Sequence, residues 1–173
     1  MNAMEAMLSR RSIRKYKDIM VPRELLDRIL EAGTYAATGR GAQSPIMIAV
    51  TNRQMRDKLS RMNAAIMGTD SDPFYGAPVV IVVLADKSKP TVNIHDGSLV
   101  MGNLMLAAHE LGLGSCWIHR AKEEFESEEG KEILRSLGIE GEYVGVGHCV
   151  LGYPDCELPK AAPRKENYIY YID

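Results

Sequence analysis

Residues 96–118, DGSLVMGNLMLAAHELGLGSCWI, decide the fold of this chain. Over residues 96–111 apolar side chains surround the helix axis almost completely, which predicts a helix that is buried on nearly every side. A glycine-rich break at 112–114 ends this helix, and residues 115–118 form a short predicted strand. Because a single domain of this size has difficulty covering every side of such a helix, the pattern favours a second subunit packed against it.

The rest of the chain predicts further helices and strands around this segment. Apolar residues at helical spacing predict helices over 22–37, 53–67 and 127–137, with a short helix over 2–8. Strands are expected over 46–51, 78–85, 143–151 and, behind a proline-rich arm, 168–172. The run 78–85, PVVIVVLA, has no polar alternation and is expected to be covered on both faces. Strands and helices do not alternate regularly along the sequence, so the sequence favours an α+β fold over a doubly wound one.

Length and composition exclude several classes of protein. A chain of 173 residues with 46% hydrophobic and 25% charged residues is typical of one soluble globular domain, expected to span residues 1–173. The net charge of −2 supplies no global positive field for nucleic acid, and no apolar run reaches the roughly 18 residues of a membrane helix. We therefore expect a cytoplasmic protein with no nucleic-acid or membrane partner. Its three cysteines are expected to be free thiols.

A basic cluster lies near the N-terminus. Arg10, Arg11 and Arg14 surround Ser12, and a phosphate group is best held by several guanidinium donors together with a hydroxyl. These charges suit one phosphate better than a duplex backbone. The alternative is a solvated basic surface, which is the commoner meaning of such a cluster.

Three weaker candidates lie further along the chain. The glycines before Trp117 could let the backbone approach a planar ligand, although a helix end beside a core tryptophan explains them equally well. The amide of Gln43, in the loop 38–45, could bind the edge of a heterocycle. Arg164 and Lys165 could add cations to an anion site, or could simply belong to a surface turn.

The sequence lacks the residue spacings that other common types of site require. Neither GxGxxG nor GxxxxGK[ST] occurs, which argues against the common dinucleotide and phosphate-loop folds. His119, His148, Cys149 and Cys156 lack the CxxC or HExxH spacing of a zinc site, so we expect no metal.

Taken in order, RRSIRKY, AATGRGAQSP, the segment 96–118 and the late PRK resemble the nitroreductase family over nearly the whole chain. The resemblance implies an α+β fold with a central, mostly antiparallel sheet flanked by helices. It also implies a homodimer that holds two FMN molecules at its interface. The aromatic run 168–172 is suited to crossing over and pairing with the other subunit's sheet edge, so we expect the C-terminal strand to be exchanged between subunits.

The resemblance assigns roles to individual residues. Arg10, Arg11 and Ser12 correspond to phosphate and ribityl contacts, Arg14 to a cation near the flavin pyrimidine, and Arg164 to a late phosphate contact. The remaining expected cofactor contacts are Thr38, Gln43, Ser44, Cys116, Trp117 and Ile118. Many relatives carry an asparagine where this chain has residues 39–42, so one hydrogen bond to the cofactor is either lost or supplied by the backbone.

The implied activity is transfer of a hydride from NADH or NADPH through FMN to a small acceptor such as a nitroaromatic or a quinone. Because the flavin carries the chemistry, no catalytic side chain is expected. The alternatives are a specialised enzyme with the same cofactor, a protein that stores or senses FMN without turnover, and a structural domain with no flavin.

Overall fold

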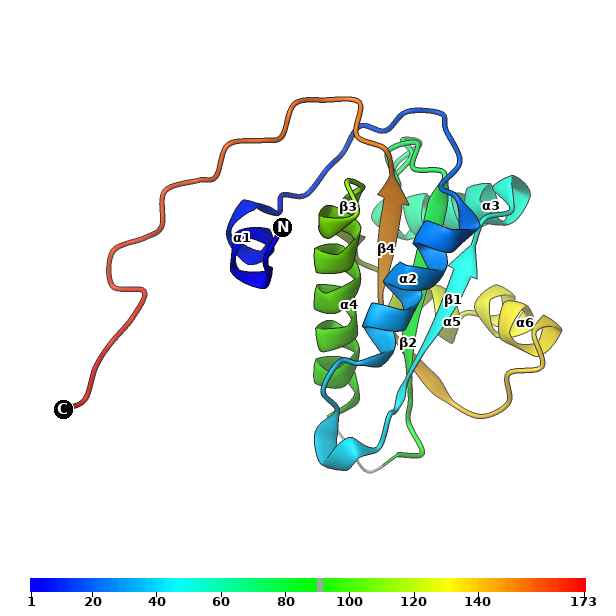
Figure 1. Ribbon diagram of the computed structural model, residues 1–173. Coiled ribbons are helices and arrows are strands. Elements are labelled where there is room, and N and C mark those ends of the chain that lie inside the picture. Colours follow the sequence, from blue (N-terminus) through cyan, green and yellow to red (C-terminus); the bar gives the residue numbers. More distant parts are fainter. Residues whose placement is uncertain (90–91) are drawn as a thin grey trace.

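A four-stranded antiparallel sheet lies at the centre of the part of the chain that the computed structural model describes, residues 1–89 and 92–173. The strands are β1 (Pro45–Val50), β2 (Val79–Asp86), β3 (Gly114–Ile118) and β4 (Tyr143–Gly152), in the spatial order β1-β2-β4-β3. Helices cover both faces (Figure 1). The α+β class and the antiparallel sheet are therefore confirmed.

Strand β2 is the most deeply buried element. Its residues 79–85 are 0% exposed, because alternate side chains enter the two apolar cores on opposite faces of the sheet. The expectation that the run 78–85 is covered on both faces is confirmed. An irregularity beside Val83 changes the register with β4. Val146 and Cys149 therefore pack in the same core, although residues three positions apart normally face opposite sides of a strand.

Helices α2 (Arg23–Thr34) and α4 (Asn93–Glu110) cover one face of the sheet. Their buried residues Leu26, Ile29, Met101 and Leu104 pack on that face's β-branched side chains. Helix α4 approaches β4 closely at Gly97, where an added Cβ would lie 2.4 Å from Val146 Cγ2. This contact fixes the position of the long helix on the sheet.

The other face is covered by α3 (Arg53–Met67), α5 (Ala121–Glu126) and α6 (Glu128–Ser136). The prediction for α3 is confirmed residue for residue, and that for α6 is confirmed to within one residue at each end. Helix α5 was missed, because six residues beginning after a left-handed Arg120 show no helical period or cap in the sequence.

The N-terminal helix α1 (Ala3–Ser9) starts with a capping box. Asn2 Oδ1 accepts a hydrogen bond from the Glu5 amide at 2.9 Å, and the Asn2 amide donates to Glu5 Oε2 at 2.9 Å. After α1 the chain runs along the free edge of β3, where Ile13 N donates to Ser115 O at 2.9 Å.

Two expectations are wrong for the single chain. Residues 168–172 form no strand; they run away from the body of the molecule, and their side chains are 65–102% exposed (Figure 1). Helix α4 is buried on one side only, since Ile94 and Leu99 are 53% and 51% exposed. The physical reason is the same, because no described residue of the single chain pairs with the tail or fully covers Ile94 and Leu99 of α4.

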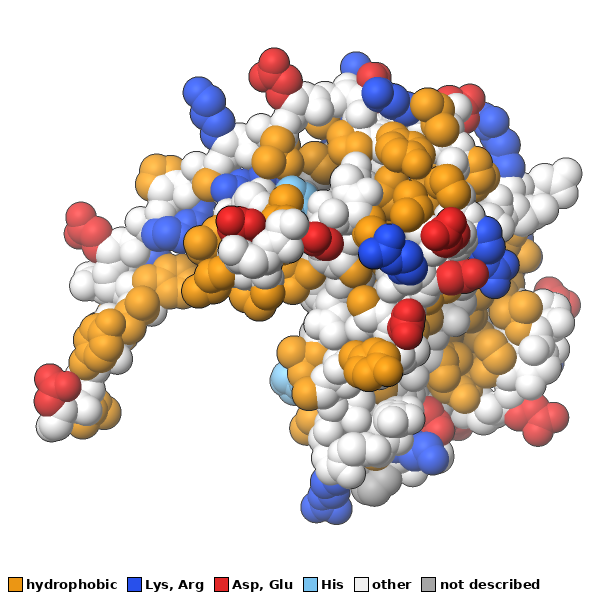
Figure 2. Space-filling model, viewed as in Figure 1, with side chains coloured by type: hydrophobic (Ala, Val, Ile, Leu, Met, Phe, Trp, Pro, Cys, Tyr) orange, Lys and Arg blue, Asp and Glu red, His pale blue; other side chains and the backbone are white. Residues whose placement is uncertain are grey.

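Apolar side chains also remain exposed on α1 and on the C-terminal tail. Figure 2 shows them along the C-terminal tail and beside α1, where Met4, Met7 and Leu8 are 64%, 58% and 71% exposed. Among the helices of the described residues, none is long and apolar enough to span a membrane.

Candidate functional site

A cavity of about 290 Å³ lies where the segment after α1 meets the end of α4. Arg10 and Arg11 line it from the N-terminal segment, His109 from α4, and Ser115 from β3. Arg10 Nη1 and Arg11 Nε are buried, yet neither atom has a hydrogen-bond partner among residues 1–89 and 92–173. Buried guanidinium donors without a partner are costly, so this cavity suits an anion.

The backbone holds these arginines in place. Arg11 Nη1 donates to Leu8 O at 2.9 Å and to Arg10 O at 2.7 Å, which satisfies carbonyls at the C-terminal end of α1. Ile13 is buried against Gly114, where an added Cβ would lie 2.8 Å from the Ile13 side chain. The glycine in β3 therefore lets the basic segment lie directly against the sheet edge.

The two remaining predicted residues of this segment do not line the cavity. Ser12 bridges to Ser115 in a parallel pairing and is half-buried, whereas Arg14 is exposed. The structure thus places Arg10 and Arg11 on the wall of the cavity and Ser12 beside them at the edge of β3.

A second group of predicted residues lies in the loop before β1. A short 3₁₀ turn, η1 (Gly39–Gly41), lies between Thr38 and Gln43, and the Gln43 amide donates to Thr38 Oγ1 at 3.1 Å. Gln43 is exposed and has a φ of 49°, and Arg40 has a φ of 56°. Two non-glycine residues in the left-handed region within one short loop indicate backbone strain, which is typical of binding loops.

Helix α4 separates the two groups. The loop is attached to its first turns through Asp96, whereas the arginine cavity lies at its other end, beside His109. These residues are thirteen positions apart in one helix, a distance of roughly 20 Å at 1.5 Å per residue. A single chain does not bring all the predicted cofactor contacts to one place.

Strand β3 divides its predicted residues between its two faces. Cys116 and Ile118 are buried in the core beneath α3, so their side chains are not exposed to a ligand. Trp117 lies on the α4 face against Gly147, and an added Cβ there would lie 2.5 Å from Trp117 Nε1. This indole nitrogen is buried and lacks a hydrogen-bond partner among the described residues.

Arg164 lies apart from both groups. It is exposed on the C-terminal tail, and its guanidinium donates to Ala162 O at 2.7 Å through Nη2. It does not line the cavity that holds Arg10 and Arg11.

The sequence motifs assign no role in the site to two polar residues of α4. Asp96 fixes the loop of Gln43, and His109 lines the arginine cavity. Both lie near the ends of a helix whose buried side is otherwise apolar, and a polar side chain on or beside that side is the signal that could have identified them.

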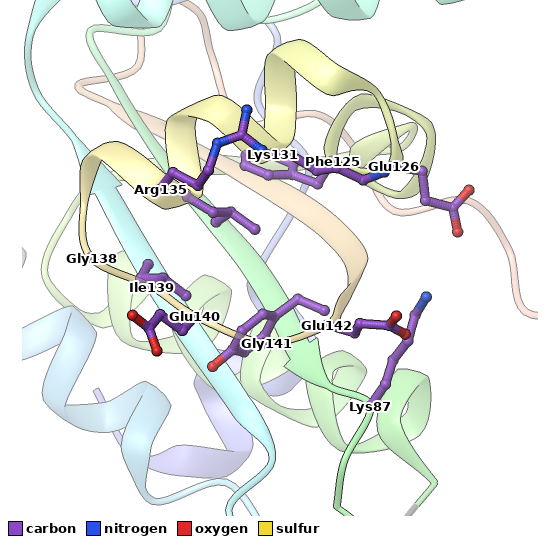
Figure 3. A pocket seen from close by; sticks show the side chains of 12 residues that line it. Lys87, Phe125, Glu126, Lys131, Arg135, Gly138, Ile139, Glu140, Gly141 and Glu142 are labelled. Atoms are coloured by element: carbon purple, nitrogen blue, oxygen red, sulfur yellow. The ribbon is translucent and has the colours of Figure 1, made fainter.

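A wider hollow of about 720 Å³ lies between α6 and the loop before β4 (Figure 3). Charges of both signs line it, from Lys87, Lys131 and Arg135 and from Glu126, Glu140 and Glu142. None of the predicted cofactor contacts lies there, and Arg135 is already paired with Glu128 at 2.7 Å. Within residues 1–89 and 92–173 no group of three or more potential metal ligands occurs.

An antiparallel sheet between two helical layers, with a cavity lined by two arginines at the end of a long helix, defines an α+β protein with a basic cavity at its sheet edge. The chain belongs to the Nitroreductase family, whose model matches residues 7–153.

Individual relatives agree with this assignment. The chain is 34% identical over 160 residues to a Methanothermobacter thermautotrophicus protein provisionally named NADH dehydrogenase/NAD(P)H nitroreductase, covering 89% of this chain and 78% of that one. It is 28% identical to an NADPH-flavin oxidoreductase of Vibrio harveyi, covering 94% of this chain and 70% of that one. The crystal structure of a Bacteroides fragilis nitroreductase with bound FMN superposes with a TM-score of 0.89, at 27% identity and 100% coverage of both chains.

Proposed function

We propose that this chain, acting as one domain of residues 1–173, is an FMN-dependent oxidoreductase. It takes a hydride from NADH or NADPH and passes it on to small acceptors such as nitroaromatics or quinones. Family membership and the activities named for the relatives support the proposal. The observation that carries it is the pair of buried, unpartnered nitrogens of Arg10 and Arg11.

These residues fit the phosphate of FMN. A phosphate monoester carries about 1.5 to 2 negative charges near pH 7 and offers three strong acceptor oxygens. Arg10 Nη1 and Arg11 Nε offer two donors in a cavity that also contains Ser115. A phosphate would satisfy both donors, and the charge-assisted hydrogen bonds would offset the cost of burying the guanidinium groups.

The other predicted residues have binding and electrostatic roles. FMN, when bound, supplies the hydride chemistry, so the chain's residues serve to hold it and to tune its charge. Arg14 is exposed on the same segment, and its positive charge would stabilise negative charge on the flavin ring. Thr38 and Gln43 supply polar groups from the loop, and Ser44 holds that loop through its buried hydrogen bond to Asp96. Cys116, Trp117 and Ile118 form the strand edge, and Arg164 is a further cation for the phosphate.

We also propose that the working unit is a homodimer whose two subunits build each flavin site. The separation of the two residue groups by the length of α4 supports a shared site, because the loop of one subunit can then face the arginines of the other. The exposed apolar side chains of α1, α4 and the tail supply the surface that such an interface would bury. Residues 168–172 would then pair with the other subunit's sheet edge, and Arg164 would move with them.

The cytoplasm remains the proposed compartment. All three cysteines are free thiols, with Cys116 and Cys149 buried and Cys156 exposed, as expected where thiols stay reduced.

The absorbance spectrum of the purified protein tests the proposed function. We expect a yellow protein that releases FMN, rather than FAD, on denaturation, and whose visible absorbance is bleached by NADH or NADPH without oxygen. Adding a nitroaromatic or a quinone should restore the colour. A protein that binds no flavin even after incubation with FMN contradicts the proposal, and bound FMN that neither nicotinamide bleaches indicates storage or sensing instead.

A further inference from the structure

His109 faces the arginine cavity from the last turn of α4. Its Nε2 lies 2.7 Å from Ser9 Oγ, and Ser9 Oγ donates to the Glu5 carbonyl at 2.6 Å. A hydroxyl has one proton, so Ser9 must accept a hydrogen bond from His109 Nε2. The neutral ring therefore carries its proton on Nε2, and Nδ1 is the atom that gains a proton when the ring becomes charged.

The surroundings keep this ring neutral in the absence of an anion. Burial lowers the pKa of His109, the positive charges of Arg10 and Arg11 lower it further, and Glu110 acts in the opposite direction. Glu110 is itself paired with the N-terminal amine of Met1 at 3.1 Å. Met1 also lines the cavity. The remaining titratable group on the cavity wall is the thiol of Cys156.

A phosphate bound between the arginines would raise the pKa of His109. Its negative charge compensates the repulsion from both guanidinium groups and adds a direct attraction for a proton on the ring. The cavity would then hold three cationic groups around one dianion.

We propose that His109 is a third phosphate-binding residue of this site, positioned by Ser9, and that its ring takes up a proton at Nδ1 when the phosphate group of FMN binds. This inference rests on the proposed function, since FMN is the phosphorylated ligand. It goes further by naming a residue to which the resemblance assigns no role and by making cofactor affinity depend on pH.

The direction of that dependence follows from the two states of the ring. The pKa of His109 is low in the free protein and is raised in the complex, so between these two values binding takes up a proton. In that window the affinity of the wild type for FMN falls as the pH rises. The phosphate itself loses its second proton near pH 6 and contributes the opposite trend, which a variant without the imidazole isolates.

The test compares flavin-free wild type with His109→Gln, titrated with FMN at about pH 6 and about pH 8.5. We expect His109→Gln to weaken FMN binding about tenfold at the lower pH, the scale of a lost charge-assisted hydrogen bond, and less than about twofold at the higher pH. Riboflavin, which has no phosphate, should bind both proteins equally. His95→Gln removes an exposed histidine near the other end of α4 and should behave as the wild type at both pH values.

A second measurement needs no variant. Calorimetry of wild-type FMN binding at about pH 7, in two buffers of different ionisation enthalpy, should show net uptake of protons, and riboflavin binding should show none. FMN binding that is equally weakened by His109→Gln at both pH values, or that proceeds without proton uptake, overturns this inference and leaves the proposed function intact. Failure of the wild type to bind FMN at either pH overturns both.

Discussion

Ser44 Oγ donates a hydrogen bond to Asp96 Oδ2 at 3.1 Å, and both side chains are almost completely buried, at 1% and 2% exposed. The other carboxylate oxygen, Oδ1, accepts from Gly39 N at 2.8 Å. One carboxylate thus attaches both ends of the η1 loop to the start of α4. The left-handed conformations of Arg40 and Gln43 persist because this attachment holds them.

Replacing Asp96 should therefore loosen the loop and destabilise the fold. Asp96→Ala leaves Gly39 N–H and the Ser44 hydroxyl without their acceptor, at an expected cost of about 3 kcal/mol in the free energy of unfolding. Urea denaturation measures this cost. The matched control is Asp18→Ala, because Asp18 is 91% exposed and lies 3.9 Å from Arg53, so its loss should cost less than about 1 kcal/mol. Equal costs for the two variants would show that Asp96 does not hold the loop.

The loss of folding stability at acid pH should depend on Asp72. Burial acts to raise the pKa of this carboxyl, but hydrogen bonds from Arg56, Ser60 and the amides of Gly76 and Phe74 outweigh it, so the pKa is lowered. The folded state thus prefers the ionised form. Its contribution is complete above the ordinary pKa of an aspartate and is lost as the pH falls through the lowered value.

Asp72→Asn should accordingly reduce stability at pH 7 by about 1 kcal/mol, discounted for the partial exposure of the group, and the difference should shrink under acid conditions. Thermal unfolding between about pH 2 and pH 7 measures it. Asp70→Asn, an exposed carboxyl in the same loop, is the control and should leave the profile unchanged. A constant difference at every pH would contradict the assignment.

The three thiols should differ in reactivity. Burial raises the pKa of the Cys149 thiol to about 12, with a smaller contribution from Cys116, and both side chains lie in the cores. Cys156 is exposed. A disulfide reagent at about pH 8 should label one thiol per folded chain quickly and all three after denaturation. Cys156→Ser should remove the fast phase; rapid labelling that survives this change would mean that a core opens readily.

Local patterns in the sequence predicted the parts of the fold that depend on local physics. The β-branched run 78–85 identifies its strand because both faces of that strand are buried in the cores. The helical spacing over 53–67 identifies its helix because one side of that helix packs in one of the cores. The tail 168–172 has strand propensity, but a strand also needs a partner strand, and within the described residues the tail pairs with neither edge of the sheet.

The candidate site was predicted in part for a similar reason. The motif RRSIRKY indicates a phosphate site because arginine donors adjacent in sequence stay adjacent in space. Asp96 and His109 act on residues 52 to 100 positions away, and no local pattern reports such pairings. The placement of Gln43 and Arg10 near opposite ends of α4 also emerges only from the fold.

That placement leads to the last prediction, which tests whether two subunits share each site. One variant carries Arg10→Ala and Arg11→Ala, and the other carries Thr38→Ala and Gln43→Ala. Each should fold and dimerise, because these side chains lie at the edge of the cavities or in an exposed loop rather than in either core. Each should bind FMN weakly as a homodimer, since both of its sites lack one group of contacts.

Mixing the two variants under conditions that exchange subunits distinguishes a shared site from a site within one chain. In a shared site, a mixed dimer has one pocket with both defects and one pocket with neither. Random exchange makes half of the dimers mixed, so about a quarter of the wild-type number of tight FMN sites should return, with the same fraction of NAD(P)H-dependent activity. If each chain builds its own site, every pocket keeps a defect and mixing restores nothing. Titrating FMN into the exchanged mixture, with each homodimer as the control, measures the recovery; its absence despite mixed dimers detected by differential tagging would refute the shared site.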